Sequence, residues 1–175
     1  MRHPKRTWHP DAAGILTRLA YARAKASGID TKVLLKQANL TINHIKNPDM
    51  RLGASNQIKF LNLAATAVRD DLFGFHLAQM VDLREFGFLY YVAASSETLG
   101  DALQRVARYG SISNEGLALR HANGKHIRIE LRYVGISRHL DRHQIRIFCC
   151  GVCPLIPSID RHSASANQHP VHPSS

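Results

Sequence analysis

Four residues near the C-terminal end are of the types that bind zinc: His139, His143, Cys150 and Cys153. Histidines four residues apart lie on the same side of a helix, and a Cys-x-x-Cys pair could complete a tetrahedral site. Zinc fingers, however, usually separate their two pairs of ligands by about a dozen residues or more. Here six residues, 144–149, separate His143 from Cys150. The spacing therefore favours a protein without a metal or other cofactor, and zinc binding is kept as a lesser alternative.

A second group of residues has the composition of a small-molecule site. Phe86, Phe88, Tyr90 and Tyr91 lie in the stretch FGFLYYVAASS, and Arg84 precedes it. Aromatic walls with a few polar groups are typical of pockets that hold small organic ligands. In the alternative interpretation, Phe86 and Tyr90 are ordinary core residues and Tyr91 lies at the surface.

Catalysis finds little support among the other motifs. The sequence contains neither a glycine-rich phosphate loop nor a Gly-x-Ser-x-Gly nucleophile turn. Its eleven histidines are scattered or lie near the ends of the chain. We therefore expect a protein that is not an enzyme.

The net positive charge is compatible with a polyanionic partner. Lysine and arginine exceed aspartate and glutamate by 23 to 13, giving a net charge of +10 and a pI near 10.0. Residues 30–47 could form a helix-turn-helix with 41–46 as its recognition helix, so a small basic DNA-binding protein is the alternative function. A helix that short would reach few base edges in a major groove, and two short packing helices fit the segment better.

The remaining composition indicates a globular protein of the cytoplasm. Apolar residues make up 45% of the chain, but no run approaches the length needed to cross a membrane, and no secretory signal is recognisable. The three cysteines lie within residues 149–153, which is not the pattern of a disulfide framework. We therefore expect no membrane partner.

Hydrophobic periodicity predicts an α+β fold, mainly helical with a late antiparallel β-hairpin and a short closing helix. Apolar residues recur every three or four positions from Asp11 onward. After Gly116 the period changes to two, on both sides of Asn123-Gly124, which is a strong hairpin signal. A last helix begins near Asp141. We therefore expect six or seven helices in one domain over 11–148, between a flexible basic lead, 1–10, and an irregular tail, 149–175.

Polar residues at the expected helix ends support these boundaries. Asp30, Thr41 and Thr98 are suited to accept hydrogen bonds at helix N-termini, and Ser55 is expected to begin a long helix. Gly28 can end the first helix in a left-handed conformation.

Several of these segments together resemble one family, the N-terminal, arabinose-binding-like sensory domain of AraC-family transcription regulators. The resemblance covers about residues 16–145. Its most distinctive residues are Leu83-Arg84-Glu85-x-Gly87, Tyr90-Tyr91, Ser95-Ser96-x-Thr98-Leu99-Gly100-x-Ala102-Leu103, Arg108-Tyr109 and Asp141-Arg142-His143-Gln144.

This resemblance implies a cytoplasmic regulator whose N-terminal domain binds a small-molecule effector or mediates association, for example as a homodimer. We expect a pocket enclosed by helices and roofed by the hairpin, with Arg84, Tyr90 and Tyr91 lining or flanking it and His143 as a further candidate. In the family, a C-terminal pair of helix-turn-helix motifs contacts DNA. Here the amphipathic helix expected after Gln144 gives way to CCGVCPLIP, so we expect a truncated or frame-shifted relative that lacks the DNA-binding domain.

Overall fold

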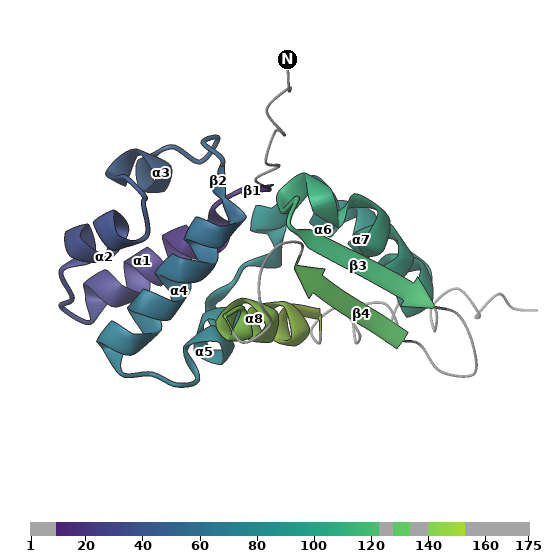
Figure 1. Ribbon diagram of the computed structural model, residues 1–175. Helices are drawn as coiled ribbons and strands as arrows, with labels where there is room; N and C mark the ends of the chain where they lie inside the picture. The colour runs from purple at the N-terminus through teal and green to yellow at the C-terminus, as the bar shows by residue number, and fades with distance from the viewer. Residues whose placement is uncertain (1–9, 123–127, 134–139, 153–175) are drawn as a thin grey trace, which may run out of the picture.

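Helices dominate the computed structural model, which describes residues 10–122, 128–133 and 140–152 (Figure 1). In chain order the elements are β1 (Asp11–Ala12), α1 (Ile15–Ala26), α2 (Thr31–Gln37), α3 (Ile42–Lys46), β2 (Leu52–Gly53), α4 (Ala54–Val68), α5 (Phe73–Met80), the 3-10 helix η1 (Leu83–Phe86), α6 (Phe88–Ala94), α7 (Leu99–Ser113), β3 (Leu117–Ala122), β4 (Arg128–Tyr133) and α8 (Arg142–Val152). The predicted fold class, α+β and mainly helical with a late hairpin, is confirmed.

The helix-end predictions are confirmed at most positions. Asp30 accepts a hydrogen bond from the backbone N–H of Lys32 at 3.0 Å, and Thr98 Oγ1 accepts one from the N–H of Asp101 at 3.1 Å. Gly28 follows α1 with a φ of +76°, a value that glycine adopts without strain. The prediction for Ser55 was wrong by one residue, because α4 begins at Ala54 and has no side-chain cap.

The late hairpin pairs β3 with β4 in antiparallel register, with Leu117 opposite Tyr133 and Ala122 opposite Arg128. The Asn123-Gly124 turn lies outside the described residues. A second antiparallel pair, β1 with β2, joins Ala12 to Leu52 and was not expected from the sequence. Two residues per strand are too few to produce a period-two pattern.

Helices α1, α2, α4 and α5 enclose the larger core. On α4, Ile58, Leu61 and Ala65 are buried and Val68 is half-buried, and of these Leu61, Ala65 and Val68 belong to the larger core. The largest apolar side chains buried in this core are Phe60, Leu61, Phe73 and Leu77. The N-terminal half therefore has a core of its own.

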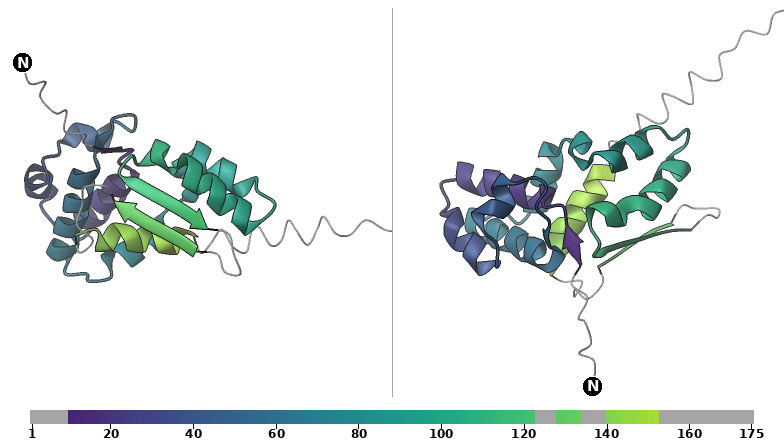
Figure 2. Two further views of the ribbon diagram at one scale, coloured as in Figure 1. Left: turned by 45° about the vertical axis from the view of Figure 1, so that its right-hand side comes forward. Right: turned by 90° about the horizontal axis from the view of Figure 1, so that it is seen from above.

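A smaller apolar cluster holds α6 against α7. It consists of Ala93, Ala102 and Val106, with Leu89 and Leu99 packed around them. Helix α8 lies between this cluster and the larger core, as the view from above shows (Figure 2). Two successive residues of α8 contact different clusters. Ile147 is buried in the larger core, and Phe148 packs against the smaller cluster. Helix α8 thus joins the two halves of the molecule.

Polar contacts also attach α8 to the N-terminal half. Asn62 Nδ2 of α4 donates a hydrogen bond to the carbonyl of Leu140 at 2.8 Å. Arg146 Nη1 donates one to the carbonyl of Asp71 at 2.6 Å. These two contacts hold the first turns of α8 against α4 and the start of α5.

The end of α8 differs from the expected boundary. An irregular tail was predicted from residue 149, whereas the helix continues to Val152. Ile145 and Phe148 of this helix are both partly buried. The helix continues because the residues up to Val152 contain no proline, and the first proline follows at Pro154.

The segment considered as a helix-turn-helix forms α2 and α3. Helix α3 has five residues, none of them buried, and is therefore about 8 Å long. It lies against α1 beside the larger core (Figure 1). These two short helices show the packing arrangement that the sequence favoured, and DNA binding through them stays an untested alternative.

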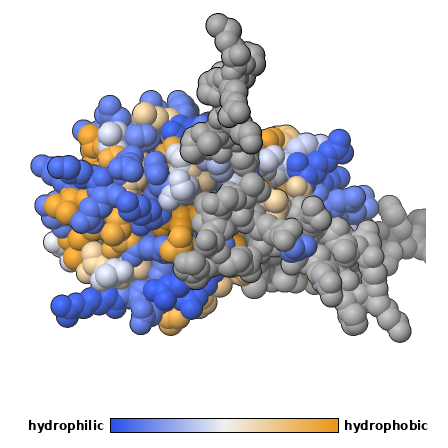
Figure 3. Space-filling model, in the orientation of Figure 1, coloured by the Kyte–Doolittle hydropathy of each residue, from blue (hydrophilic) through white to orange (hydrophobic). Residues whose placement is uncertain are grey.

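The exposed apolar side chains do not form one face of the visible surface. In Figure 3 apolar and hydrophilic residues are interspersed over the helical N-terminal half. The most exposed large apolar residues come from several different elements: Leu72, Met80, Phe88, Tyr91 and Ile112. Scattered exposure of this kind is normal for a globular protein.

Replacing Gly74 by alanine tests the contact between α5 and α8. A Cβ at Gly74 would lie 2.2 Å from the backbone oxygen of His143 and 2.8 Å from its Cα. Because both obstacles are backbone atoms, the helices must separate, and we expect the free energy of unfolding to fall by about 3 kcal/mol in chemical denaturation.

Gly100→Ala is the matched control, because a Cβ there would meet Thr98 Oγ1 at an ordinary 3.7 Å. We expect that variant to keep its stability or gain about 0.5–1 kcal/mol. Equal stability of the Gly74→Ala protein and the wild type would contradict the close helix contact.

Candidate ligand pocket

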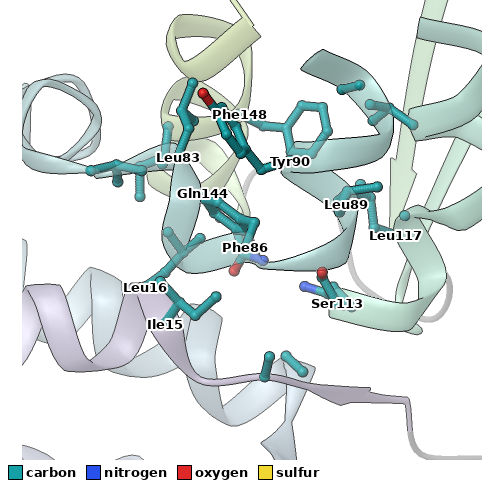
Figure 4. A pocket seen from close by; sticks show the side chains of 18 of the residues that line it. Ile15, Leu16, Leu83, Phe86, Leu89, Tyr90, Ser113, Leu117, Gln144 and Phe148 are labelled. Carbon is teal, nitrogen blue, oxygen red and sulfur yellow. The ribbon is translucent and has the colours of Figure 1, made fainter. Parts of the chain in front are cut away.

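A pocket of about 120 Å³ lies where the two halves and α8 meet (Figure 4). The start of α1, the 3-10 helix η1, the inner faces of α6 and α7, the beginning of β3 and one face of α8 all contribute to its wall. Elements far apart in the sequence therefore enclose one space, as expected for a ligand site between packed helices.

The wall of the pocket is mostly hydrocarbon. Its larger apolar side chains are Ile15, Leu16, Val81, Leu83, Phe86, Leu89, Leu99, Leu103, Val106, Leu117, Ile147 and Phe148. From the hairpin, the described lining comprises Leu117, at the start of β3. Helices thus form most of the enclosure that the sequence predicted, and the described part of the hairpin reaches it at one end.

A few uncharged polar side chains interrupt this apolar wall. Gln57 and Gln144 are both almost fully buried, and Gln57 Oε1 accepts a hydrogen bond from the hydroxyl of Thr17 at 3.3 Å. Ser113 and Asn114 lie at the end of α7. Among the described residues that line the pocket, none carries a charged side chain. The site can therefore offer amide and hydroxyl groups to a ligand, together with a large apolar surface.

Of the four residues selected from the sequence, Tyr90 is part of this wall. Arg84 is 70% exposed and forms an ion pair with Asp82, with 2.7 Å between Nη2 and Oδ2. Hydrogen bonds from the Arg84 side chain and backbone lower the pKa of the Asp82 carboxyl. Tyr91 is 62% exposed and meets the ring of Tyr90 edge to face. Arg84 and Tyr91 therefore lie outside the pocket lining, and a ligand-binding role for either stays a prediction.

His143 lies beside the pocket, on the side of α8 that faces α5. Its Nδ1 accepts a hydrogen bond from the backbone N–H of Gly74 at 3.3 Å, and its Nε2 lies 3.2 Å from Arg142 Nε. The imidazole also meets the ring of Phe73 edge to face. These contacts give His143 a packing role between the helices, while the next residue, Gln144, lines the pocket.

The alternative zinc set cannot be assembled from the residues that are described. His139 and Cys153 lie outside them, and His143 already contacts Gly74 and Arg142 through its two ring nitrogens. Within the described ranges no group of three or more potential metal ligands occurs.

The sequence did not indicate most of the pocket wall. Leu103, Val106 and Phe148 have the spacing of ordinary core residues, and nothing in that pattern separates a core position from a cavity wall. Gln57 gave a weak signal, because it is a glutamine on the otherwise apolar face of a long helix. A polar residue at such a position indicates either a buried hydrogen bond or a site, and here Gln57 has both.

The family described as the arabinose-binding domain of AraC transcription regulators, N-terminal, matches residues 28–156. The chain belongs to this family. A search of curated proteins found no match. Within the part of the chain that is described, no helix is long and apolar enough to cross a membrane.

The residues that carry the AraC-family resemblance are mainly structural. Thr98 caps the N-terminus of α7, and Gly87, with a positive φ of 56°, forms the turn that precedes α6. The segment 141–144 begins α8 and places His143 against α5 and Gln144 against the pocket. In this AraC-type domain these residues therefore set the ends and turns of the helices around the pocket, while most of the pocket lining comes from residues outside the family pattern.

The buried histidine predicts a specific pH dependence of stability. Burial lowers the pKa of His143 below its ordinary value of 6.5, and the positive charges of Arg142 and Arg146 lower it further, outweighing Asp70 and Asp71. The unfolded chain therefore binds a proton at a pH where the folded protein does not. Stability is retained above pH 6.5 and is lost as the pH falls from there toward the folded pKa.

We expect the free energy of unfolding to decrease from about pH 7.5 to about pH 5.5, by at most about 1.4 kcal/mol per pH unit from this group. In His143→Asn the decrease should be smaller, because the titrating group is gone and the carboxamide can still accept from Gly74. His76→Asn, at a half-exposed position on α5, is the control. Denaturation curves of equal pH dependence for wild type and His143→Asn would contradict this assignment.

Proposed function

We propose that this domain senses a small-molecule effector that binds in the pocket between the two halves, and that binding is transmitted through α8. The position of α8 carries the proposal. Ile147 packs in the larger core and Phe148 in the smaller cluster, while both residues and Gln144 also line the pocket. A ligand there contacts both halves and the helix that joins them.

The energetics of an unfilled cavity support a sensory role. In the pocket of about 120 Å³ the apolar groups of the wall lack packing partners on one side, and unfilled apolar space of this kind is destabilising. A ligand that fills the space recovers part of that free energy. Because it contacts the two halves at once, it stabilises the arrangement in which they are closed around it.

In this proposal, ligand binding is energetically coupled to the closure of the two halves. An effector can shift a two-state equilibrium only by the difference in its affinity for the two states. Coupling free energies in allosteric proteins are typically about 1–3 kcal/mol, which corresponds to roughly a 5- to 150-fold change in the ratio of the two states. In this proposal, closure around the ligand changes the placement of α8 relative to α6 and α7.

Three further proposals are based on membership of the AraC family alone, and no feature of the pocket supports them. They are association of the domain into a homodimer, a cytoplasmic location, and DNA contact through the C-terminal domain that the family's regulators carry. Sedimentation of the purified chain would test the first of them directly.

The aromatic wall residue provides the sharpest test of the site. The experiment begins with a thermal-shift screen of small metabolites against the wild type and against Ala102→Leu, in which the added side chain fills the pocket from α7. Compounds that stabilise the wild type alone identify pocket ligands. For such a compound, Tyr90→Ala should weaken binding about tenfold, since it removes roughly 1.4 kcal/mol of apolar contact.

Tyr91→Ala is the matched control, because it removes the same side chain from the neighbouring exposed position. We expect its dissociation constant, measured by titration calorimetry, to equal that of the wild type. An effector whose affinity depends on Tyr91 and not on Tyr90 would place the binding site outside the pocket. A screen in which every stabilising compound also stabilises Ala102→Leu would do the same.

A further inference from the structure

We propose that the effector is a compact, uncharged and mostly apolar molecule, of the size of a singly substituted aromatic or alicyclic ring, and not a sugar. This inference rests on the proposed function, because it concerns the same pocket. The proposed ligand differs from arabinose, the sugar in the family's name. The proposal is based on the charge, the hydrogen-bonding groups and the size of the pocket.

The first observation concerns charge. None of the described residues that line the pocket is an acid, a base or a histidine. An ionised ligand buried there would lose its hydration without gaining a counter-ion, at a cost of several kcal/mol. Nearby arginines do not fill that role, since Arg84 is exposed and paired with Asp82, and Arg18 and Arg146 donate to the backbone carbonyls of Ala13 and Asp71. The site therefore disfavours carboxylates, phosphates and amino acids.

The second observation concerns hydrogen bonds. A monosaccharide carries a hydroxyl group on nearly every carbon, and each one needs a partner when it is buried. The wall offers few: the amides of Gln57 and Gln144, the hydroxyl of Tyr90, and Ser113 and Asn114 at one end. The Oε1 atom of Gln57 already accepts from Thr17 at 3.3 Å. One or two polar groups on a ligand can be satisfied here, whereas a polyol would bury several unpaired hydroxyls against Leu89, Leu103 and Val106.

The third observation concerns size. The pocket, at about 120 Å³, is well below the roughly 300–1,000 Å³ of sites that hold drug-sized ligands. It is close to the roughly 150 Å³ of an engineered apolar cavity that binds benzene. A single six-membered ring with one small substituent matches this space. The ring would pack among the apolar side chains and its substituent would reach the amide of Gln144 on α8.

Four probes of similar size test the effects of ligand charge and hydrogen-bonding groups separately: toluene, benzamide, benzoate and L-arabinose. Benzamide and benzoate have the same number of non-hydrogen atoms and differ in charge. We expect toluene and benzamide to raise the melting temperature of the wild type by about 4 °C at ten times their dissociation constants. Benzoate and L-arabinose should leave the melting temperature unchanged at the same concentrations.

Two variants assign the effect to the pocket. Ala102→Leu fills it and should abolish both shifts, whereas Ala22→Leu makes the same change at an exposed position of α1 and should retain them. If Ala102→Leu does not fold, Ala93→Val on the α6 wall replaces it. Gln144→Leu should weaken benzamide binding about tenfold, by loss of one hydrogen bond, and leave toluene binding unchanged.

The outcomes separate this inference from the proposed function. If L-arabinose or benzoate binds more tightly than benzamide and loses its effect in Ala102→Leu, the inference is wrong and the sensory function of the pocket stands. If neither toluene nor benzamide binds, the inference is again wrong, and the metabolite screen decides the function separately. Shifts that persist in Ala102→Leu would place the aromatic probes elsewhere and also overturn the inference.

Discussion

The arrangement of this domain depends on the close approach of two helices at Gly74. Only a residue without a side chain lets the backbone of α5 come so near to the backbone of His143, and this contact fixes the position of α8 along α5. From that position α8 can place Ile147 in the larger core and Phe148 in the smaller cluster. The pocket exists because one helix has to satisfy two separate packing surfaces at once.

The same constraint explains why the cavity is not closed by side-chain rearrangement. Its walls belong to clusters that are already well packed, namely the core around Phe60 and Phe73 and the contact of Ala93 with Ala102. Collapse would require one half to move toward the other and would disturb the anchors of α8 at Asn62 and Arg146. Packed interiors respond to such demands by switching between discrete arrangements more readily than by deforming continuously. A pocket held between two separately packed clusters is therefore a suitable place for a ligand to select one arrangement.

The sequence predicted those parts of the structure that depend on local chemistry. The caps at Asp30 and Thr98, the end of α1 at Gly28 and the hairpin all follow from residues close together in the chain. The site was predicted less well, because it is formed by elements from β1 to α8. Arg84 was chosen for its charge, yet its nearest opposite charge, Asp82, is two residues away and holds it at the surface. The apolar side chains of the pocket wall have the same spacing as core residues, so periodicity cannot distinguish the two.

The protein as a whole is basic, but the described wall of its pocket is uncharged, and the composition alone does not show this difference. A net charge of +10 suggests attraction of anions, and such a field accelerates encounter with a polyanion at low salt. The described pocket wall carries none of this charge, and the arginines nearest to it are paired with Asp82 or with backbone carbonyls. In the proposed site, selection of the effector therefore depends on shape, apolar contact and a few uncharged polar groups. The basic surface can act on a different partner without altering which small molecule the pocket accepts.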